Sequence, residues 1–367
     1  MKIVHFSDLH LDSPFAWAGT AGRTARQRRQ ALRDTLVRVV DLTHKVKAHA
    51  LFCGGDLYEQ EYFRLDTAEF LKATFAGLAP IPVYIAPGNH DWYGPKSLYA
   101  QVDWSENVHV FREAVLRRVE LSDGLWLWGA AHLGPANAGN FLQGFCVDQS
   151  GTHIALFHGA ERSWFGEQGT GKQLHAAFDA SEIETVGLAH AFLGHYHRPK
   201  DAEFHTYPGN PDPLVFGEDG ERGAVVATIG PDGLVTRARH RVAVTEAHDE
   251  ELDVTGLATR QQILDRLEAK VSSLSGFVRL TVRGEIASTI DINEGDLRDR
   301  LNNFDAAQIV FGDLRPSYDL ESISQEPTVR GQFVRDVFGS NLAEEEKQRV
   351  VVTGLRALEG RTDLEVI

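Results

Sequence analysis

Residues 1–12 read MKIVHFSDLHLD, in which a short apolar run, 3–6, leads directly into Asp8 and His10. The same arrangement recurs four times along the chain, each time with an apolar run that ends at an acid, an amide or a histidine. These runs are 50–53 before Asp56, 83–86 before Asn89 and His90, 154–157 before His158, and 191–193 before His195 and His197. A short apolar run bounded by turn-forming residues is consistent with a buried strand. The sequence therefore predicts five strands with reactive side chains at their ends.

Helix-length segments separate these runs. Between 23 and 47, Leu32, Leu36, Val39 and Val40 recur at spacings of three and four, which predicts a helix with one apolar face. Residues 66–78 and 95–102 are shorter helical candidates. The alternation predicts an α/β domain in which helices cover the sheets. Because ligands of open α/β sheets bind beyond the carboxyl ends of the strands, we expect the polar residues at those ends to meet.

The polar residues at the strand ends form a set of metal ligands. Seven of them offer a carboxylate, amide or imidazole atom, namely Asp8, His10, Asp56, Asn89, His158, His195 and His197. Mixed oxygen and nitrogen donors suit manganese, iron or zinc, whereas calcium and magnesium favour oxygen alone. Seven ligands exceed what one ion with an open position requires, but two ions sharing a carboxylate would use them all. A solitary histidine is more often a hydrogen-bonded core residue, so the ordered set favours the two-metal site.

Five segments carry a family resemblance. VHFSDLHLD, GGDLYE, PGNHDW, FHG and LGHYHRP resemble the ordered motifs of the calcineurin-like metallophosphoesterases, over about residues 1–230. The resemblance implies a four-layered α/β/β/α sandwich and two-metal phosphoester hydrolysis. Within that superfamily, SDLHLDSPF, YPGNPDPLVFGE at 207–218 and the small domain that follows are similar to the SbcD-type DNA repair nucleases. Those proteins are nuclease subunits that work with an SMC-like ATPase of the SbcC type.

The resemblance also assigns roles to single residues. It implies a first metal held by Asp8, His10 and His197, a second held by Asn89, His158 and His195, and a bridging Asp56. His90 matches the catalytic histidine, which contacts the scissile phosphate or protonates the leaving oxygen. Asp91 would orient the ring of His90 and tune its charge. Manganese is the expected metal, with iron or zinc as alternatives.

One residue departs from the nuclease pattern. Nucleases of this type commonly have a DNA-positioning histidine three residues after the bridging aspartate, where this chain has Glu59. A negative charge beside the path of a polyanion argues against action on duplex ends, although Glu59 could equally be a solvated loop residue. A cluster of Arg23, Arg26, Arg28, Arg29 and Arg33 follows the first motif and could contact DNA or form a solvated helix face.

Changes in the residue pattern divide the chain into three parts. Residues 1–240 form the expected metallophosphoesterase domain, residues 241–318 a small α+β capping domain that faces DNA, and residues 319–367 a linker and helical tail. The tail resembles the segment that docks on the ATPase partner, and packing on the protein's own surface is the alternative. The helices at 66–78 and 95–102 correspond to the segments through which the resembling nucleases dimerise, so a homodimer is expected.

Composition narrows the class of protein. The formal net charge of −15 argues against a nonspecific coat for nucleic acid, although bound cations would offset several acids. Two cysteines are too few for a disulfide framework, which favours a reducing cytoplasm. The start of the chain lacks the long apolar core of a signal peptide, and no stretch approaches the ~20 apolar residues of a membrane span. We expect a cytoplasmic protein without membrane contacts.

Together these features predict a manganese-dependent phosphodiesterase acting on DNA, as an SbcD-like exonuclease or endonuclease subunit. A phosphodiesterase or phosphatase for small molecules or phosphoproteins would use the same catalytic core. The additional domain and tail favour the nuclease, since an enzyme for small substrates has less need of them. A non-catalytic scaffold with a structural metal site is disfavoured by the complete ligand set and by His90.

Overall fold

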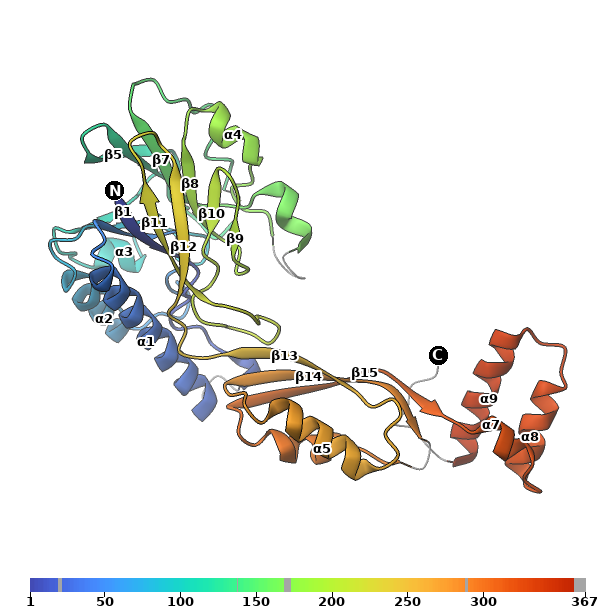
Figure 1. Ribbon diagram of the computed structural model, residues 1–367. Helices are drawn as coiled ribbons and strands as arrows, with labels where there is room; N and C mark the ends of the chain where they lie inside the picture. Colours follow the sequence, from blue (N-terminus) through green and yellow to red (C-terminus); the bar gives the residue numbers. More distant parts are fainter. Residues whose placement is uncertain (19–21, 137, 168–172, 288–289, 360–367) are drawn as a thin grey trace. The chain divides into compact units, whose positions relative to one another are not determined.

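The computed structural model describes residues 1–18, 22–136, 138–167, 173–287 and 290–359, and it separates the chain into two units (Figure 1). The first unit is Met1–Glu246 and the second begins at Ala247. The observed division follows Glu246 rather than residue 240, because a strand pair of the first sheet extends to Arg241. The division after residue 318 stays a prediction, and the end of the predicted tail, 360–367, lies outside the described residues.

The first sheet has the strand order β12-β11-β1-β2-β3-β4. Its strands are β1 (Lys2–Phe6), β2 (Ala50–Cys53), β3 (Val83–Ile85), β4 (Val108–Val110), β11 (Gly223–Ile229) and β12 (Val235–Arg241). β1, β2, β3 and β4 are parallel, whereas β11 and β12 form an antiparallel pair on the outer side of β1. The carboxyl ends of β1, β2 and β3 therefore lie along one edge.

The second sheet has the order β5-β6-β7-β8-β10-β9. Its strands are β5 (Arg117–Ser122), β6 (Leu125–Gly129), β7 (Thr152–His158), β8 (His190–Gly194), β9 (Lys200–Asp201) and β10 (His205–Tyr207). The four central strands β6, β7, β8 and β10 are parallel, and antiparallel strands close both sides. The predicted strands at 154–157 and 191–193 are the cores of β7 and β8.

Helices cover the outer faces of both sheets. The first sheet is covered by α1 (Arg23–Lys45), α2 (Leu65–Ala76) and the one-turn α3 (Leu98–Gln101). The 3₁₀ turn η1 (Ala16–Ala18) precedes α1 in the chain. Leu32, Leu36 and Val39 of α1 are buried in that layer, as the spacing predicts. The second sheet is covered by the 3₁₀ segment η2 (Arg162–Glu167) and α4 (Ala180–Thr185).

The two sheets pack face to face on an apolar core. Phe52 and Tyr84 from the first sheet meet Leu127, Ile154 and Phe192 from the second, all at most 7% exposed. The inner strands, such as β2 and β8, are buried on both faces, which accounts for their continuous apolar runs. The unit is thus the α/β/β/α sandwich that was expected, with helices outside and paired sheets inside (Figure 1).

The second unit contains a parallel three-stranded sheet, β13-β14-β15. Its elements are β13 (Ala247–Asp253), α5 (Arg260–Val271), β14 (Phe277–Ala287), α6 (Glu294–Arg298), the 3₁₀ turn η3 (Asp299–Leu301) and β15 (Ala306–Ser317). Leu267 of α5 and Leu297 of α6 pack on Leu280 and Val282 of β14. Parallel strands require crossover connections, and α5 and α6 supply them.

The acidic segment 247–253 is the strand β13. Its Asp249 and Glu251 pair with arginines of β14, Asp249 with Arg279 and Glu251 with Arg283. Opposite charges on neighbouring strands are a recognised form of cross-strand pairing. The acidic residues therefore concealed the strand in the sequence, because the arginines that pair with them lie on another strand. Leu252 of β13 is buried at 1% exposure.

Three helices follow the sheet of the second unit. They are α7 (Leu320–Ser324), α8 (Val329–Phe338) and α9 (Glu344–Glu359). The stretch 319–327, expected as a linker, contains α7, whose Ile323 joins Val334, Val337, Val351 and Leu355 in a small core. No helix within the described ranges combines the length and the apolar character needed to span a bilayer.

Candidate metal centre

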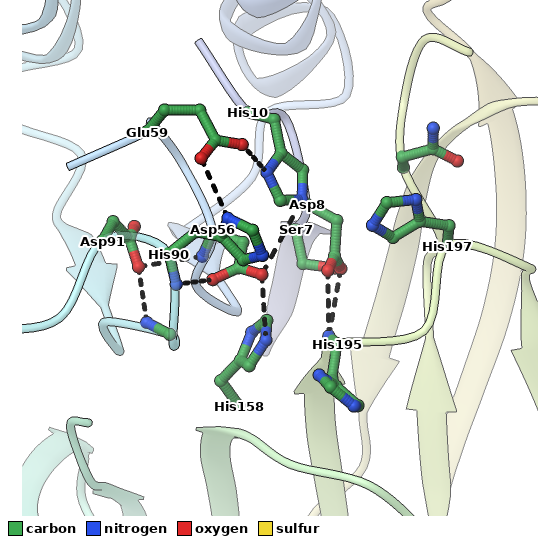
Figure 2. A network of polar contacts seen from close by, with 12 residues as sticks. Ser7, Asp8, His10, Asp56, Glu59, His90, Asp91, His158, His195 and His197 are labelled. Atoms are coloured by element: carbon green, nitrogen blue, oxygen red, sulfur yellow. Dashed lines mark hydrogen bonds and ion pairs between the residues drawn. The ribbon is translucent and has the colours of Figure 1, made fainter. Parts of the chain in front are cut away.

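The predicted site residues converge at the carboxyl ends of the strands of the first unit (Figure 2). Asp8 and His10 follow β1, Asp56 follows β2, and Asn89, His90 and Asp91 follow β3. His158 is the last residue of β7, and His195 and His197 follow β8. The two sheets thus bring together residues up to 189 positions apart, because both present their parallel strand ends at the same edge.

Most of these side chains are buried, His197 is partly exposed, and His90 is the most exposed. Asp8, Asp56, His158 and His195 are at most 3% exposed. The side chain of His90, by contrast, is 45% exposed. This difference suits a group that reaches a substrate from beside a buried cluster of ligands.

The backbone adopts uncommon conformations at four site residues. Asp8, His10, Asp56 and His195 have φ values of 55°, 51°, 51° and 113°. Non-glycine residues rarely occupy this left-handed region, and such strain gathers at functional sites because the surrounding structure enforces it. The turns direct consecutive polar side chains toward a common centre instead of letting them alternate across a strand.

Two glycines allow the loops to approach the centre. Gly55 has φ 92°, and a Cβ there would lie 2.7 Å from the carbonyl oxygen of Ala86 and 2.8 Å from Nδ1 of His158. At Gly88 a Cβ would lie 2.3 Å from Oδ1 of Asp56. Any side chain at these positions would displace the loops that carry Asp56 and Asn89.

Asp56 lies at the centre of the cluster. Its Oδ2 is 3.2 Å from Nε2 of His158 and 3.7 Å from Nε2 of His10, and its Oδ1 accepts the backbone N–H of His90 at 2.8 Å. Burial by itself would raise the pKa of Asp56, but the facing histidines, His158 first, outweigh burial and hold the pKa well below its ordinary value. The carboxylate is therefore ionised and available to cations.

Asp8 approaches the same centre from β1. Its carboxylate accepts the backbone N–H of His195 at 3.0 Å and the hydroxyl of Ser7. These two contacts fix the carboxylate across the gap between the two sheets (Figure 2). Asp8, His10 and His197 offer ligand atoms within 4.8 Å of one another, and so do Asp8, Asp56 and His158.

The donor set fits metal ions because several buried atoms have no hydrogen bond among the described residues. These atoms include Nε2 of His10 and Oδ1 of Asn89, while Nε2 of His158 faces Oδ2 of Asp56. A buried polar atom without a partner costs about 1–3 kcal/mol, so such atoms on the residues at the strand ends are what a metal site requires. Imidazole, amide and carboxylate together are ligands of the manganese, iron and zinc class. The residues at hand can thus hold divalent cations.

Three of the predicted ligand histidines have the ring nitrogen opposite the ligand atom held in place. Nδ1 of His10 donates to Glu59 and Nδ1 of His197 to Glu218, both at 2.7 Å. Nδ1 of His158 donates to the carbonyl oxygen of Gly54 at 2.8 Å. These contacts fix the tautomers so that Nε2 remains as the ligand atom.

The described hydrogen bonds of Asp91 join two loops, and its expected role toward His90 stays a prediction. Oδ1 of Asp91 accepts the N–H groups of Asp56 and Gly88, and Oδ2 accepts the N–H of Leu57 and the hydroxyl of Tyr99. Asp91 thus ties the loop after β2 to the loop after β3. Burial, and then the neighbouring Asp56 carboxylate, raise the pKa of Asp91 to about 6. It is a positioning residue for the two loops.

Glu59 holds the ring of His90 as well as that of His10. One carboxylate oxygen accepts Nδ1 of His10 at 2.7 Å and the other accepts Nδ1 of His90 at 2.9 Å (Figure 2). Its side chain is only 14% exposed, so it is no solvated loop residue. Sequence reasoning missed this role because position 59 was judged by its charge alone. Its spacing of three residues from Asp56 was the available signal.

Glu218 is the second functional residue that sequence reasoning missed. The motif 207–218 carries part of the family resemblance, but that resemblance predicted no role for its last residue. Glu218 accepts Nδ1 of His197 with one oxygen, and Nδ2 of Asn210 and the N–H of Leu214 with the other. The motif therefore acts as a support for His197.

Glu59 leads to a prediction about acid stability. Burial would raise its pKa, but hydrogen bonds from His10 and His90 outweigh burial and lower the pKa from 4.5 to about 2. A folded-state pKa below the unfolded value gives stability that is complete above pH ~4.5 and is lost as the pH falls toward 2. We expect metal-free wild-type protein to lose on the order of 2 kcal/mol more than Glu59→Gln across this window.

Urea unfolding in the presence of a chelator, repeated at several pH values, measures this difference. Glu69→Gln is the control, because Glu69 is exposed on α2 and should leave the pH dependence unchanged. Parallel curves for wild type and Glu59→Gln would contradict the assigned hydrogen bonds.

Comparisons with known proteins agree with this geometry. The profile of the calcineurin-like phosphoesterase family matches residues 1–199. A curated relative, the uncharacterized metallophosphoesterase YhaO of Bacillus subtilis (strain 168), is 27% identical over 292 residues, which cover 75% of this chain and 68% of the relative.

Two solved structures also align with part of this chain. TT1561 of Thermus thermophilus aligns with a TM-score of 0.35 and 13% identity, covering 65% of this chain and 98% of that one. A dimetal phosphatase from Danio rerio aligns with a TM-score of 0.38 and 10% identity, covering 62% of this chain and 92% of that one.

Proposed function

Because this chain belongs to the calcineurin-like phosphoesterase family, we propose that it is a manganese-dependent DNA phosphodiesterase, an SbcD-like exonuclease or endonuclease subunit. The observation that supports the reaction is the pairing of a buried ligand cluster with the exposed ring of His90. The DNA substrate is supported by the motifs 2–10 and 207–218 and by the second unit that follows the catalytic one. Iron or zinc are the alternative metals.

The chain's own residues define the reaction. Asp8, His10 and His197 would hold one cation, Asn89, His158 and His195 the other, and Asp56 would contact both. When bound, two such cations bind the phosphate oxygens, lower the pKa of a water and stabilise the developing charge. His90 supplies the proton: Glu59 holds its Nδ1, so its Nε2 is the atom that can donate to the leaving oxygen.

The arginine cluster supports DNA binding less than its sequence indicates. Arg28 is 2% exposed and bonds Asp212, Thr245 and the carbonyl oxygen of Pro213. Arg33 pairs with Asp66 on α2. These arginines hold helix α1 to its surroundings. This observation favours the second candidate, a phosphodiesterase or phosphatase for small molecules or phosphoproteins at the same site.

One experiment separates the two candidates. The purified chain is incubated with Mn²⁺ and end-labelled duplex, hairpin and single-stranded DNA, beside an aryl phosphodiester such as bis(4-nitrophenyl) phosphate. We expect cleavage of at least one DNA and of the ester, with the DNA cleavage lost in His90→Ala. Hydrolysis of the ester with every DNA left intact would transfer the assignment to the second candidate.

We also propose the partners of a nuclease subunit. Helices α8 and α9 form a small core of their own while Val329, Leu342 and Leu358 stay at least 41% exposed, which supports docking on an SMC-like ATPase of the SbcC type. A homodimer through the segments 66–78 and 95–102 is proposed as well, although Leu71, Phe75, Leu98 and Tyr99 of these segments are buried within the first unit.

The proposed compartment is the cytoplasm. Cys53 is buried and Cys146 exposed, and both are free thiols. Free thiols persist in a reducing environment, where disulfides are rare.

A further inference from the structure

The two predicted metal positions differ in the groups behind their histidines. His10 and His197, assigned to the first metal, donate to the carboxylates of Glu59 and Glu218. His158 and His195, assigned to the second metal, donate instead to backbone carbonyl oxygens. The acceptors are the oxygen of Gly54 for Nδ1 of His158, at 2.8 Å, and that of Gln173 for Nε2 of His195, at 2.9 Å.

Both supporting carboxylates are fixed by further contacts. The side chains of Glu59 and Glu218 are 14% and 12% exposed. The second oxygen of Glu59 accepts from His90, and that of Glu218 accepts Nδ2 of Asn210 and the N–H of Leu214, both at 2.6 Å. They therefore hold one orientation toward their histidines, without the rotational freedom of surface carboxylates.

The direct ligands add less to this imbalance than the supporting carboxylates do. In this assignment the second position has the neutral amide of Asn89 where the first has the carboxylate of Asp8. Asp56 is common to both, and Asp8 also offers a ligand atom within 4.8 Å of those of Asp56 and His158. The difference in charge therefore rests mainly on Glu59 and Glu218, whose carboxylates accept from the histidines of the first position.

Charge in these layers changes the affinity for a cation. A carboxylate that accepts the far N–H of a ligating imidazole increases the basicity of the imidazole, and its loss typically lowers metal affinity by about 10- to 100-fold. A carbonyl oxygen orients the ring in the same way but adds no negative charge. Coulomb attraction between these partly buried carboxylates and the cation also raises the metal affinity.

We propose that the first position binds its cation more tightly and fills first, and that Glu59 and Glu218 are the positioning residues that create this difference. The second position holds the exchangeable cation, so the protein contains one bound cation when metal is scarce. This inference rests on the two-metal site of the proposed function and is independent of its substrate.

The test is a titration of the metal-free full chain with Mn²⁺, followed by calorimetry and by electron paramagnetic resonance. We expect two binding classes whose dissociation constants differ by at least about 10- to 100-fold. The spectrum of isolated Mn²⁺ should be strongest near one equivalent and give way to a coupled spectrum near two. Equal classes, or a coupled spectrum from the first addition, would overturn the inference.

Glu218→Gln identifies the residue responsible. Its amide oxygen can still accept Nδ1 of His197 but lacks the charge, so we expect the tight class alone to weaken by about 10- to 100-fold. Glu59→Gln should weaken the same class, which keeps the test available if one variant fails to fold. The control is Glu161→Gln, since Glu161 is also buried but bonds Ser163 rather than a histidine.

The outcomes also separate this inference from the proposed function. Weakening of the loose class instead of the tight one would overturn the inference and leave the nuclease assignment untouched. Unequal classes that respond as expected, in a protein that leaves all DNA intact, would support the inference while the DNA substrate is lost. Absence of any Mn²⁺ binding would overturn both.

Discussion

Replacing Asp56 with asparagine is expected to abolish metal-dependent phosphoester hydrolysis. The carboxylate of Asp56 lies close to both His10 and His158, and it accepts the backbone N–H of His90. Among the described residues, no other carboxylate combines these three contacts. Its loss removes the group expected to contact both cations. Metal ions contribute several kcal/mol to such reactions, so the rate should fall by roughly 10³- to 10⁴-fold.

The fold should survive this substitution. Asparagine has nearly the same shape, and its oxygen can still accept the N–H of His90. We therefore expect metal-free Asp56→Asn to melt near the wild-type temperature, while Mn²⁺ stabilises the wild type and not the variant, because only a bound cation shifts the unfolding equilibrium.

Hydrolysis of an aryl phosphodiester, metal content and melting temperature with and without Mn²⁺ measure these effects. Asp41→Asn, at an exposed position of α1, is the control and should behave as wild type. A variant of Asp56 that still binds two cations and turns over substrate would remove Asp56 from the centre of the site.

Replacing His90 with alanine should separate catalysis from metal binding. Although Asp56, His10 and His90 lie within 4.8 Å of one another, the side chain of His90 is 45% exposed and its Nδ1 is committed to Glu59. A general acid typically contributes about 10²- to 10⁴-fold. We expect a loss of turnover in this range, with little change in the dissociation constants for Mn²⁺.

The choice of substrate sharpens this test. The loss should be large for DNA, whose alkoxide leaving group needs a proton, and small for an aryl phosphodiester with a good leaving group. His44→Ala is the matched control, because His44 is exposed in the last turn of α1. Equal losses on both substrates would assign His90 to phosphate binding, and loss of one Mn²⁺ equivalent would make it a ligand.

Several features could be predicted from the sequence because they depend on local patterns. The run 50–53 is strand β2, and the spacing of Leu32, Leu36 and Val39 gives the buried face of α1. Burial on both faces selects continuous apolar runs, and a helix on a sheet selects spacings of three and four. These patterns are visible in the sequence alone, so the α/β character of the first unit could be predicted.

Other elements were missed because a distant partner defines them. β13 looks like an acidic linker until Arg279 and Arg283 of β14 neutralise its outer face. Arg28 looks like a solvated charge until Asp212, 184 positions away, pairs with it in the interior. Polar residues in a sequence do not reveal whether water or another side chain will satisfy them.

By itself, the sequence determined which side chains stand at the strand ends, from Asp8 to His197, since strand length and chain direction place them there. Only the tertiary structure decided how they are supported: Glu59 joins His10 to His90, Glu218 holds His197, and Asp91 ties two loops together. A hydrogen bond depends on a few tenths of an ångström and on direction. Such geometry arises when separate loops pack together, and no spacing along the chain encodes it.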